Sequence, residues 1–165
     1  MALSKITPES INLASDFAGM GFGGTGAANQ LDDYEEGTWT PVLAFGQGST
    51  GITYANQTAR YIKIGSMVYI RFGIRLTNKG SSTGTAEITG LPFTVEPISY
   101  CDATTSSLST SGMSGLTSTV FGVFANNQTY FSLYDSGSSG STSLSEANFS
   151  NSTFVFGIGF YNVGF

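Results

Sequence analysis

The sequence contains no histidine, a single cysteine and few charged side chains. Without histidine, Ser-His-Asp and Cys-His catalysis are excluded, and so are most zinc sites. The lone Cys101 has no partner for a disulfide within the chain, which excludes the framework of a small disulfide-bonded protein. We therefore expect a protein that is not an enzyme and that holds no metal and no cofactor.

Charged residues make up 10% of the chain, against about 25% in typical soluble proteins. Residues 1–36 hold six acidic side chains against Lys5 alone, whereas residues 37–165 hold five side chains of each sign. The net charge of −5 repels a phosphate backbone, so we expect no nucleic-acid partner.

Long apolar runs are also missing. No stretch approaches the ~20 apolar residues that a membrane-spanning helix needs, and the first residues lack the apolar core of a signal peptide. We therefore expect synthesis in a cytoplasm and no insertion into a membrane.

What the chain does contain is the two-residue periodicity of β-strands. In residues 67–76 one face is apolar and the other is wetter, and helical spacing would mix the two sets. The apolar face comprises Val68, Ile70, Phe72, Ile74 and Leu76, and the wetter face comprises Met67, Tyr69, Arg71, Gly73 and Arg75. Further strands are expected at 38–45, 52–54, 59–64, 85–88, 98–103, 119–125, 129–134 and 153–163.

Turn-rich stretches separate these strands, and the pair Asn126 and Asn127 is typical of a tight hairpin because Asn tolerates positive φ. Many short strands joined by turns, with no convincing helix, predict an all-β fold: an antiparallel β-sandwich or jelly roll over residues 38–165. Residues expected in or near its core are Val68, Ile70, Phe72, Ile74, Phe121 and Phe131.

The last expected strand, 153–163, is apolar or small on both faces. One face carries Phe154, Phe156, Ile158 and Phe160, and the other carries Val155, Gly157, Gly159, Tyr161 and Val163. A closed cyclic oligomer would cover such an extra apolar face on every chain at once, so we expect a homotrimer.

Residues 1–37 differ from the rest and are expected to form an extended arm for attachment and trimerisation. The segment has a glycine-rich run at 19–26 and no core of its own. Its expected anchors are the apolar Ile6, Ile11 and Leu13 and the acidic Asp32, Asp33, Glu35 and Glu36, which would pair with basic residues of a partner. Calcium binding by the acidic group is a weaker alternative, because the EF-hand spacing is absent. The glycine run fits G-x-G-x-x-G but lacks the strand and helix of a phosphate-binding unit.

A candidate ligand site lies at the expected hairpin. Tyrosine rings with amide and carboxylate partners suit neutral glycans, and here the set is Asn126, Asn127, Tyr130, Tyr134 and Asp135. Packing in a core or an interface is the alternative role of any one of these tyrosines.

Several motifs in order resemble one known family. They are Leu31-Asp-Asp-Tyr-Glu-Glu-Gly-Thr-Trp-Thr-Pro41, Tyr54-Ala-Asn-Gln-Thr-Ala-Arg-Tyr-Ile-Lys-Ile-Gly65, the strand at 67–76 and Ile88-Thr-Gly-Leu-Pro-Phe93. Over residues 29–95 the chain resembles the C-terminal domains of bacteriophage tail-fibre and tailspike proteins, and the end of the chain is similar only in style.

The resemblance implies a trimeric β-sandwich in a virion, where it contacts a host surface polysaccharide or assists assembly. Members of that family usually carry a long upstream shaft, so we expect either a short fibre or attachment to other tail or capsid proteins through residues 1–37. A head-decoration protein or another structural virion protein without a host ligand is one alternative. A glycan depolymerase is another, although no two carboxylates of residues 38–165 are placed by the sequence to form a cleft.

Overall fold

The computed structural model describes residues 20–21, 30–31, 33–97, 108–138 and 140–164. These residues form two five-stranded antiparallel sheets and one short pair of strands, and their single helical element is the 3-10 turn η3 (Glu146–Asn148). The expectation of an all-β, antiparallel protein is therefore confirmed. The expected strand at 98–103 lies outside the described residues.

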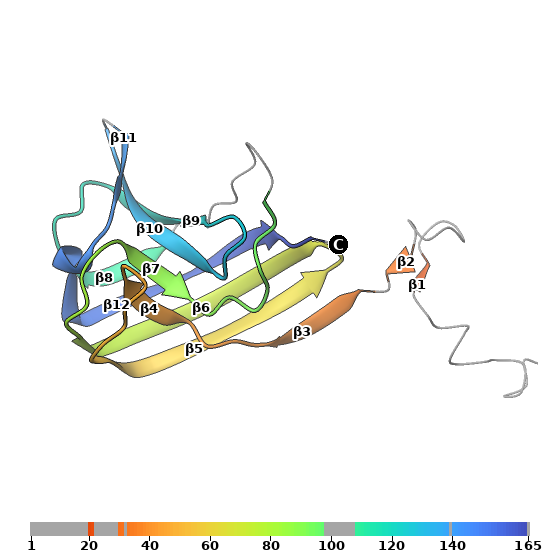
Figure 1. Ribbon diagram of the computed structural model, residues 1–165, viewed down its shortest axis with the longest axis horizontal. Helices are drawn as coiled ribbons and strands as arrows, with labels where there is room; N and C mark the ends of the chain where they lie inside the picture. Colours follow the sequence, from red (N-terminus) through yellow and green to blue (C-terminus); the bar gives the residue numbers. More distant parts are fainter. Residues whose placement is uncertain (1–19, 22–29, 32, 98–107, 139, 165) are drawn as a thin grey trace, which may run out of the picture.

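The larger sheet has the strand order β3-β5-β6-β12-β8. Its long strands run side by side along the whole body (Figure 1). The bounds are β3 (Tyr34–Thr38), β5 (Ile52–Ile64), β6 (Met67–Lys79), β12 (Phe149–Asn162) and β8 (Ser109–Met113).

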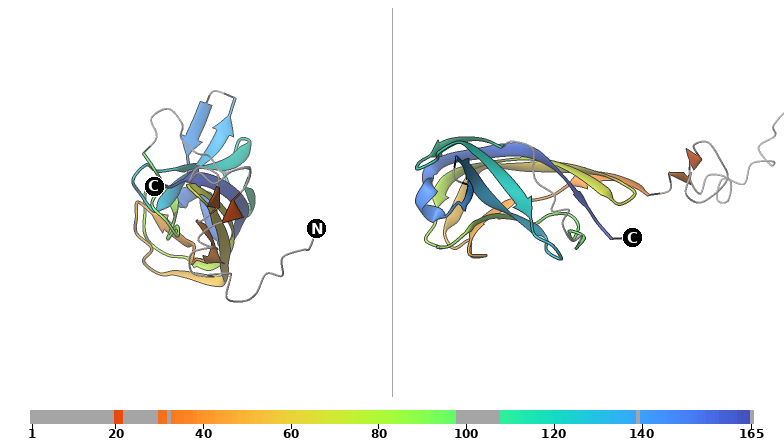
Figure 2. Two further views of the ribbon diagram at one scale, coloured as in Figure 1. Left: turned by 90° about the vertical axis from the view of Figure 1, so that its right-hand side faces the viewer. Right: turned by 90° about the horizontal axis from the view of Figure 1, so that it is seen from above.

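The second sheet has the order β11-β10-β7-β4, with β9 paired to β10. It lies against one face of the larger sheet, and its strands cross the long strands at an angle (Figure 2). Its bounds are β4 (Val42–Phe45), β7 (Ala86–Thr89), β9 (Thr119–Phe124), β10 (Tyr130–Gly137) and β11 (Gly140–Ser143). The separate pair is β1 (Met20–Gly21) with β2 (Gln30–Leu31).

One core fills the space between the two sheets. Val68, Ile70 and Ile74 of β6 are at most 1% exposed, and Phe72 packs on Phe131 of β10 with ring centroids 5.5 Å apart. The alternation expected for β6 is thus confirmed, because its even-numbered residues from 68 to 76 are all buried.

Phe121 is the exception among the expected core residues. The buried residues of β9 are Val120, Gly122 and Phe124, so the side chain of Phe121 points to the opposite face of the second sheet. There it is half-buried and stacks on Tyr134 with centroids 5.8 Å apart. The expectation that Phe121 lies in the core is wrong, because the side chain is on the opposite face of β9. Both faces of residues 119–124 are apolar, so periodicity alone cannot tell which of them is buried.

Several strand boundaries differ from the expected ones. The expected strand 38–45 is divided between β3 and β4, which belong to different sheets. Pro41 lies in the connection between them, where its missing N–H interrupts no hydrogen bond between strands. Segments 52–54 and 59–64 are one strand, β5, whose register shifts around Tyr54. Strands β8 and β11 occupy stretches rich in Ser and Gly that were expected to be turns.

The expected hairpin at Asn126 and Asn127 is confirmed. Asn127 has φ of 60°, and the turn joins β9 to β10 in an antiparallel pair. Gln128 N–H donates to the carbonyl of Ala125 at 3.1 Å, which closes the turn.

The two faces of the second sheet can be tested by a pair of substitutions. Phe131→Ala is expected to lower the free energy of unfolding by about 3–5 kcal/mol, because it removes a fully buried ring. Phe121→Ala is expected to cost roughly half as much, since its ring is half-buried. Urea unfolding followed by circular dichroism measures both, and equal costs would contradict the face assignment.

Candidate functional site

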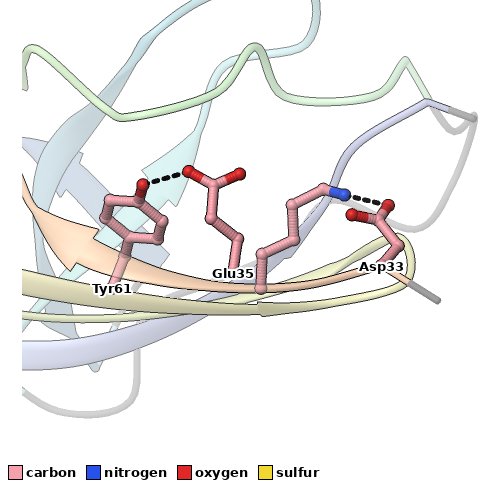
Figure 3. A network of polar contacts seen from close by, with 4 residues as sticks. Asp33, Glu35 and Tyr61 are labelled. Carbon is pink, nitrogen blue, oxygen red and sulfur yellow. Dashed lines mark hydrogen bonds and ion pairs between the residues drawn. The ribbon is translucent and has the colours of Figure 1, made fainter. Parts of the chain in front are cut away.

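Strand β3 is held on β5 by contacts of its acidic side chains. Lys63 forms an ion pair with Asp33, and the hydroxyl of Tyr61 donates a hydrogen bond to Glu35 (Figure 3). The N–H of Gly65 donates to the carbonyl of Asp33 at 2.9 Å. Asp33 and Glu35 are therefore paired within their own chain. The sequence had suggested instead that they pair with basic residues of a partner.

The expected arm thus overlaps the body at its last residues, because Tyr34–Thr38 pairs with β5 over five residue pairs. Glu36 points to the other face of β3 and accepts a hydrogen bond from the hydroxyl of Tyr34 at 3.1 Å. The remaining expected anchors Ile6, Ile11, Leu13 and Asp32 lie outside the described residues.

The expected ligand residues are not all brought together. Tyr130 and Tyr134 lie on the same outward face of β10, whereas Asp135 points to the core and is 4% exposed. Asp135 is also five residues from Tyr130, or roughly 17 Å along an extended strand. Asn126 and Asn127 are exposed in the β9–β10 turn next to Tyr130.

Asp135 anchors a loop. One carboxylate oxygen accepts hydrogen bonds from the Thr117 N–H at 2.5 Å and the Thr117 hydroxyl at 2.7 Å, and the other accepts the Ser118 N–H at 3.0 Å. These bonds, the Thr117 hydroxyl first, lower the pKa of Asp135. The expectation that Asp135 binds a ligand therefore does not agree with its position, because both of its oxygens are already occupied.

Two other carboxylates have the same kind of role. Glu87 is 6% exposed and accepts the Gln47 N–H at 3.1 Å, and burial raises its pKa while that bond opposes the shift. Glu146 accepts the Gly84 N–H at 2.8 Å, and this bond is the main cause of its lowered pKa. In the parts of the chain that the structure describes, no three His, Cys, Asp or Glu residues gather where they could hold a metal ion.

The most unusual surface is the outer face of the larger sheet, which points away from the core. Six large apolar side chains are exposed by 38–54%, and the strand registers place all of them on this one face. They are Tyr34, Ile64, Met67, Phe156, Ile158 and Phe160. Four of them, Tyr34, Ile64, Met67 and Phe160, lie towards the β5–β6 turn, and we call these four the apolar end.

Next to the apolar end, the same face carries a pair of arginines. Arg60 of β5 and Arg71 of β6 are direct partners in the register and are both exposed. Arg75 lies on the same face, opposite Phe154. The wetter face predicted for residues 67–76 is thus confirmed, and the structure adds the neighbours that meet it from β5 and β12.

Sequence reasoning missed the arginine pair, although the chain holds a signal for it. Gly65 and Ser66 form a two-residue turn between Ile64 and Met67, and Gly65 has φ of 56°. A hairpin with that turn places Arg60 opposite Arg71. The register of a hairpin with this turn would therefore have predicted that Arg60 and Arg71 lie side by side.

The comparisons with known proteins identify no relative: no family model, no curated protein and no solved structure matches the chain. Among the described residues, no helix has the length and apolar character to cross a membrane.

The role of Asp135 predicts a particular response to acid. Its lowered pKa means that its stabilisation is complete above the pKa of an unfolded Asp, about 3.9, and is lost as the pH falls through the lower folded value. Asp135→Asn should melt at a lower temperature than the wild type at neutral pH, and the difference should shrink below pH ~4. Glu96→Gln is the control. Equal melting temperatures of wild type and Asp135→Asn at pH 7 would contradict the anchoring role.

Proposed function

We propose that the chain is a non-enzymatic structural protein of a bacteriophage virion, a short tail fibre or receptor-binding protein, built as a homotrimer of β-sandwiches. The observation that carries the proposal is the clustering of exposed large apolar side chains on one face of the larger sheet. Monomeric proteins rarely expose a contiguous apolar patch of this kind, and such patches mark contacts with other molecules.

Self-association is the contact that the apolar end suits best. Its four side chains come from four neighbouring strands, β3, β5, β6 and β12, and Tyr34 is the first residue of β3, so the apolar end lies where the chain enters the larger sheet. Copies that meet through this end would bring their N-terminal segments together, as attachment to one virion component requires. The number three comes from the resemblance to tail-fibre domains, which usually trimerise.

The absence of an enzymatic role is supported by how the carboxylates are used. Glu87, Asp135 and Glu146 each accept backbone N–H groups from a loop, so these three act as structural anchors. A glycosidase needs two carboxyl groups facing each other across a substrate cleft. The contact with host polysaccharide is proposed for the exposed β9–β10 turn, with Asn126 and Asn127, and for the outward face of β10, which carries Tyr130 and Tyr134.

The proposed homotrimer is tested by measuring the molecular mass of the protein in solution. Wild-type protein at micromolar concentration should scatter light as a particle of three times the 17.3 kDa chain mass. The double variant Met67→Asp with Phe160→Asp should be monomeric and folded, because two desolvated carboxylates would oppose the contact. Asn56→Asp, which adds a charge to the same face away from the apolar end, should stay trimeric. A monomeric wild type would contradict the proposal.

The place in the virion and the host contact are tested on particles. Antibody against the body should label tail tips in electron micrographs, and label on the capsid would favour a head-decoration protein. Tyr130→Ala with Tyr134→Ala should weaken adsorption to host cells by about 1–3 kcal/mol of binding free energy, and should leave incorporation unchanged. Adsorption equal to wild type would place recognition elsewhere on the protein.

A further inference from the structure

The outer face of the larger sheet has two adjoining hollows. The first has a volume of about 850 Å³ and includes Thr58, Gly73, Phe156 and Ile158 in its lining. The second has a volume of about 460 Å³ and includes Glu36, Ile62 and Tyr69. Both are within or near the size range of small-molecule sites, roughly 300–1,000 Å³. Arg60, Arg71 and Thr38 line both hollows, so the arginine pair lies between them.

Among the residues that the structure describes, Arg60 and Arg71 have no acceptor for their charge. The described residues contain one ion pair, between Lys63 and Asp33, and the structure gives no hydrogen bond to the side chains of Arg60 and Arg71. Like charges placed directly opposite on neighbouring strands destabilise a sheet. Two cations held side by side next to an apolar surface form an arrangement that an anion would stabilise, and the planar guanidinium groups suit a carboxylate above all.

The first hollow is shaped by a glycine. Gly73 lies opposite Phe156 in the register, and a Cβ built on it would reach the Cβ of Phe156 at 3.6 Å. A larger side chain at this position would occupy the hollow. One wall is apolar, formed by Phe156 and Ile158, and hydroxyl groups of Thr58 and Ser109 lie among the other lining residues.

Trp39 also contributes to the lining of the first hollow, but its ring belongs to the core: it is 8% exposed and packs on Phe72 with ring centroids 6.1 Å apart. Because Phe72 faces the second sheet, the indole lies on the core side of the larger sheet and is not part of the outer face.

From these contacts we propose that the two hollows bind an acidic saccharide, with a sugar carboxylate on Arg60 and Arg71. The C–H face of a sugar ring lies on Phe156 and Ile158, and hydroxyls of the ligand meet Thr58 and Ser109. Because the arginines stand between the hollows, the ligand extends to both sides of them, which favours an oligosaccharide. Glu36 lines the second hollow and repels a further negative charge, so the sugar in that hollow is uncharged.

This site goes beyond the proposed function. It differs from the β9–β10 turn in location and from neutral glycans in ligand charge, and neither hollow is lined by the four side chains of the apolar end, although Tyr69 of the second hollow packs on Phe160. Either proposal can therefore fail without the other.

The test uses a hyaluronan hexasaccharide, which alternates glucuronate with a neutral sugar, and its carboxyl-reduced derivative as the uncharged match. Isothermal titration calorimetry of the full-length protein measures the binding of both without a reporter group in the site. Titration with the acidic oligosaccharide should give a saturable heat of binding, and the carboxyl-reduced derivative should bind at least about tenfold more weakly.

The matched variants separate the arginine pair from general positive charge. Arg60→Gln and Arg71→Gln should each weaken binding about 10- to 100-fold, whereas Arg75→Gln, on the same face but outside the two linings, should change it less than about twofold. Light scattering on the same samples should give the wild-type mass for all three. The proposal is overturned if the acidic oligosaccharide does not bind at millimolar concentration, if its reduced form binds equally, if Arg75→Gln weakens binding as much, or if Arg60→Gln or Arg71→Gln alters the assembly.

Discussion

The alternation of side chains along β6 is the constraint on which the rest of the structure depends. This strand is paired on both edges, with β5 and with β12, so its pleat sets which residues of all three strands face the core. Val68, Ile70, Phe72 and Ile74 meet the second sheet, and the residues between them form the centre of the outer face. A shift of one residue would exchange the two sets, which would bury Arg71 and expose Phe72.

The chain has few charged side chains, and several of them have a specific structural role. Lys63 and Asp33 hold β3 on its neighbour, and Glu87, Asp135 and Glu146 fix loops through backbone N–H groups. These side chains are used for the architecture. Arg60, Arg71 and Arg75 differ because they stand on one face without an acceptor in the described residues, and this difference separates a structural role from a binding role.

The sequence predicted the fold class and the faces of β6 because periodicity depends only on local spacing. It predicted neither β8 nor β11, since their Ser- and Gly-rich segments gain strand structure from pairing with β12 and β10. The face of Phe121 could not be read from a strand that is apolar on both sides. Asp135 was taken for a ligand residue because its partners, Thr117 and Ser118, lie far from it along the chain and leave no local sign.

The attachment of β3 also has a mechanical consequence. Its five residue pairs with β5 run from Tyr34 opposite Ile64 to Thr38 opposite Arg60, antiparallel and in register. Tension pulling on Tyr34 along the strand axis would load these pairs together in shear, because the strand would have to slide past its neighbour as a unit. The ion pair between Asp33 and Lys63 lies at the end where such a pull would begin. The sheet edge is thus arranged as a tether that resists axial force better than it would resist peeling.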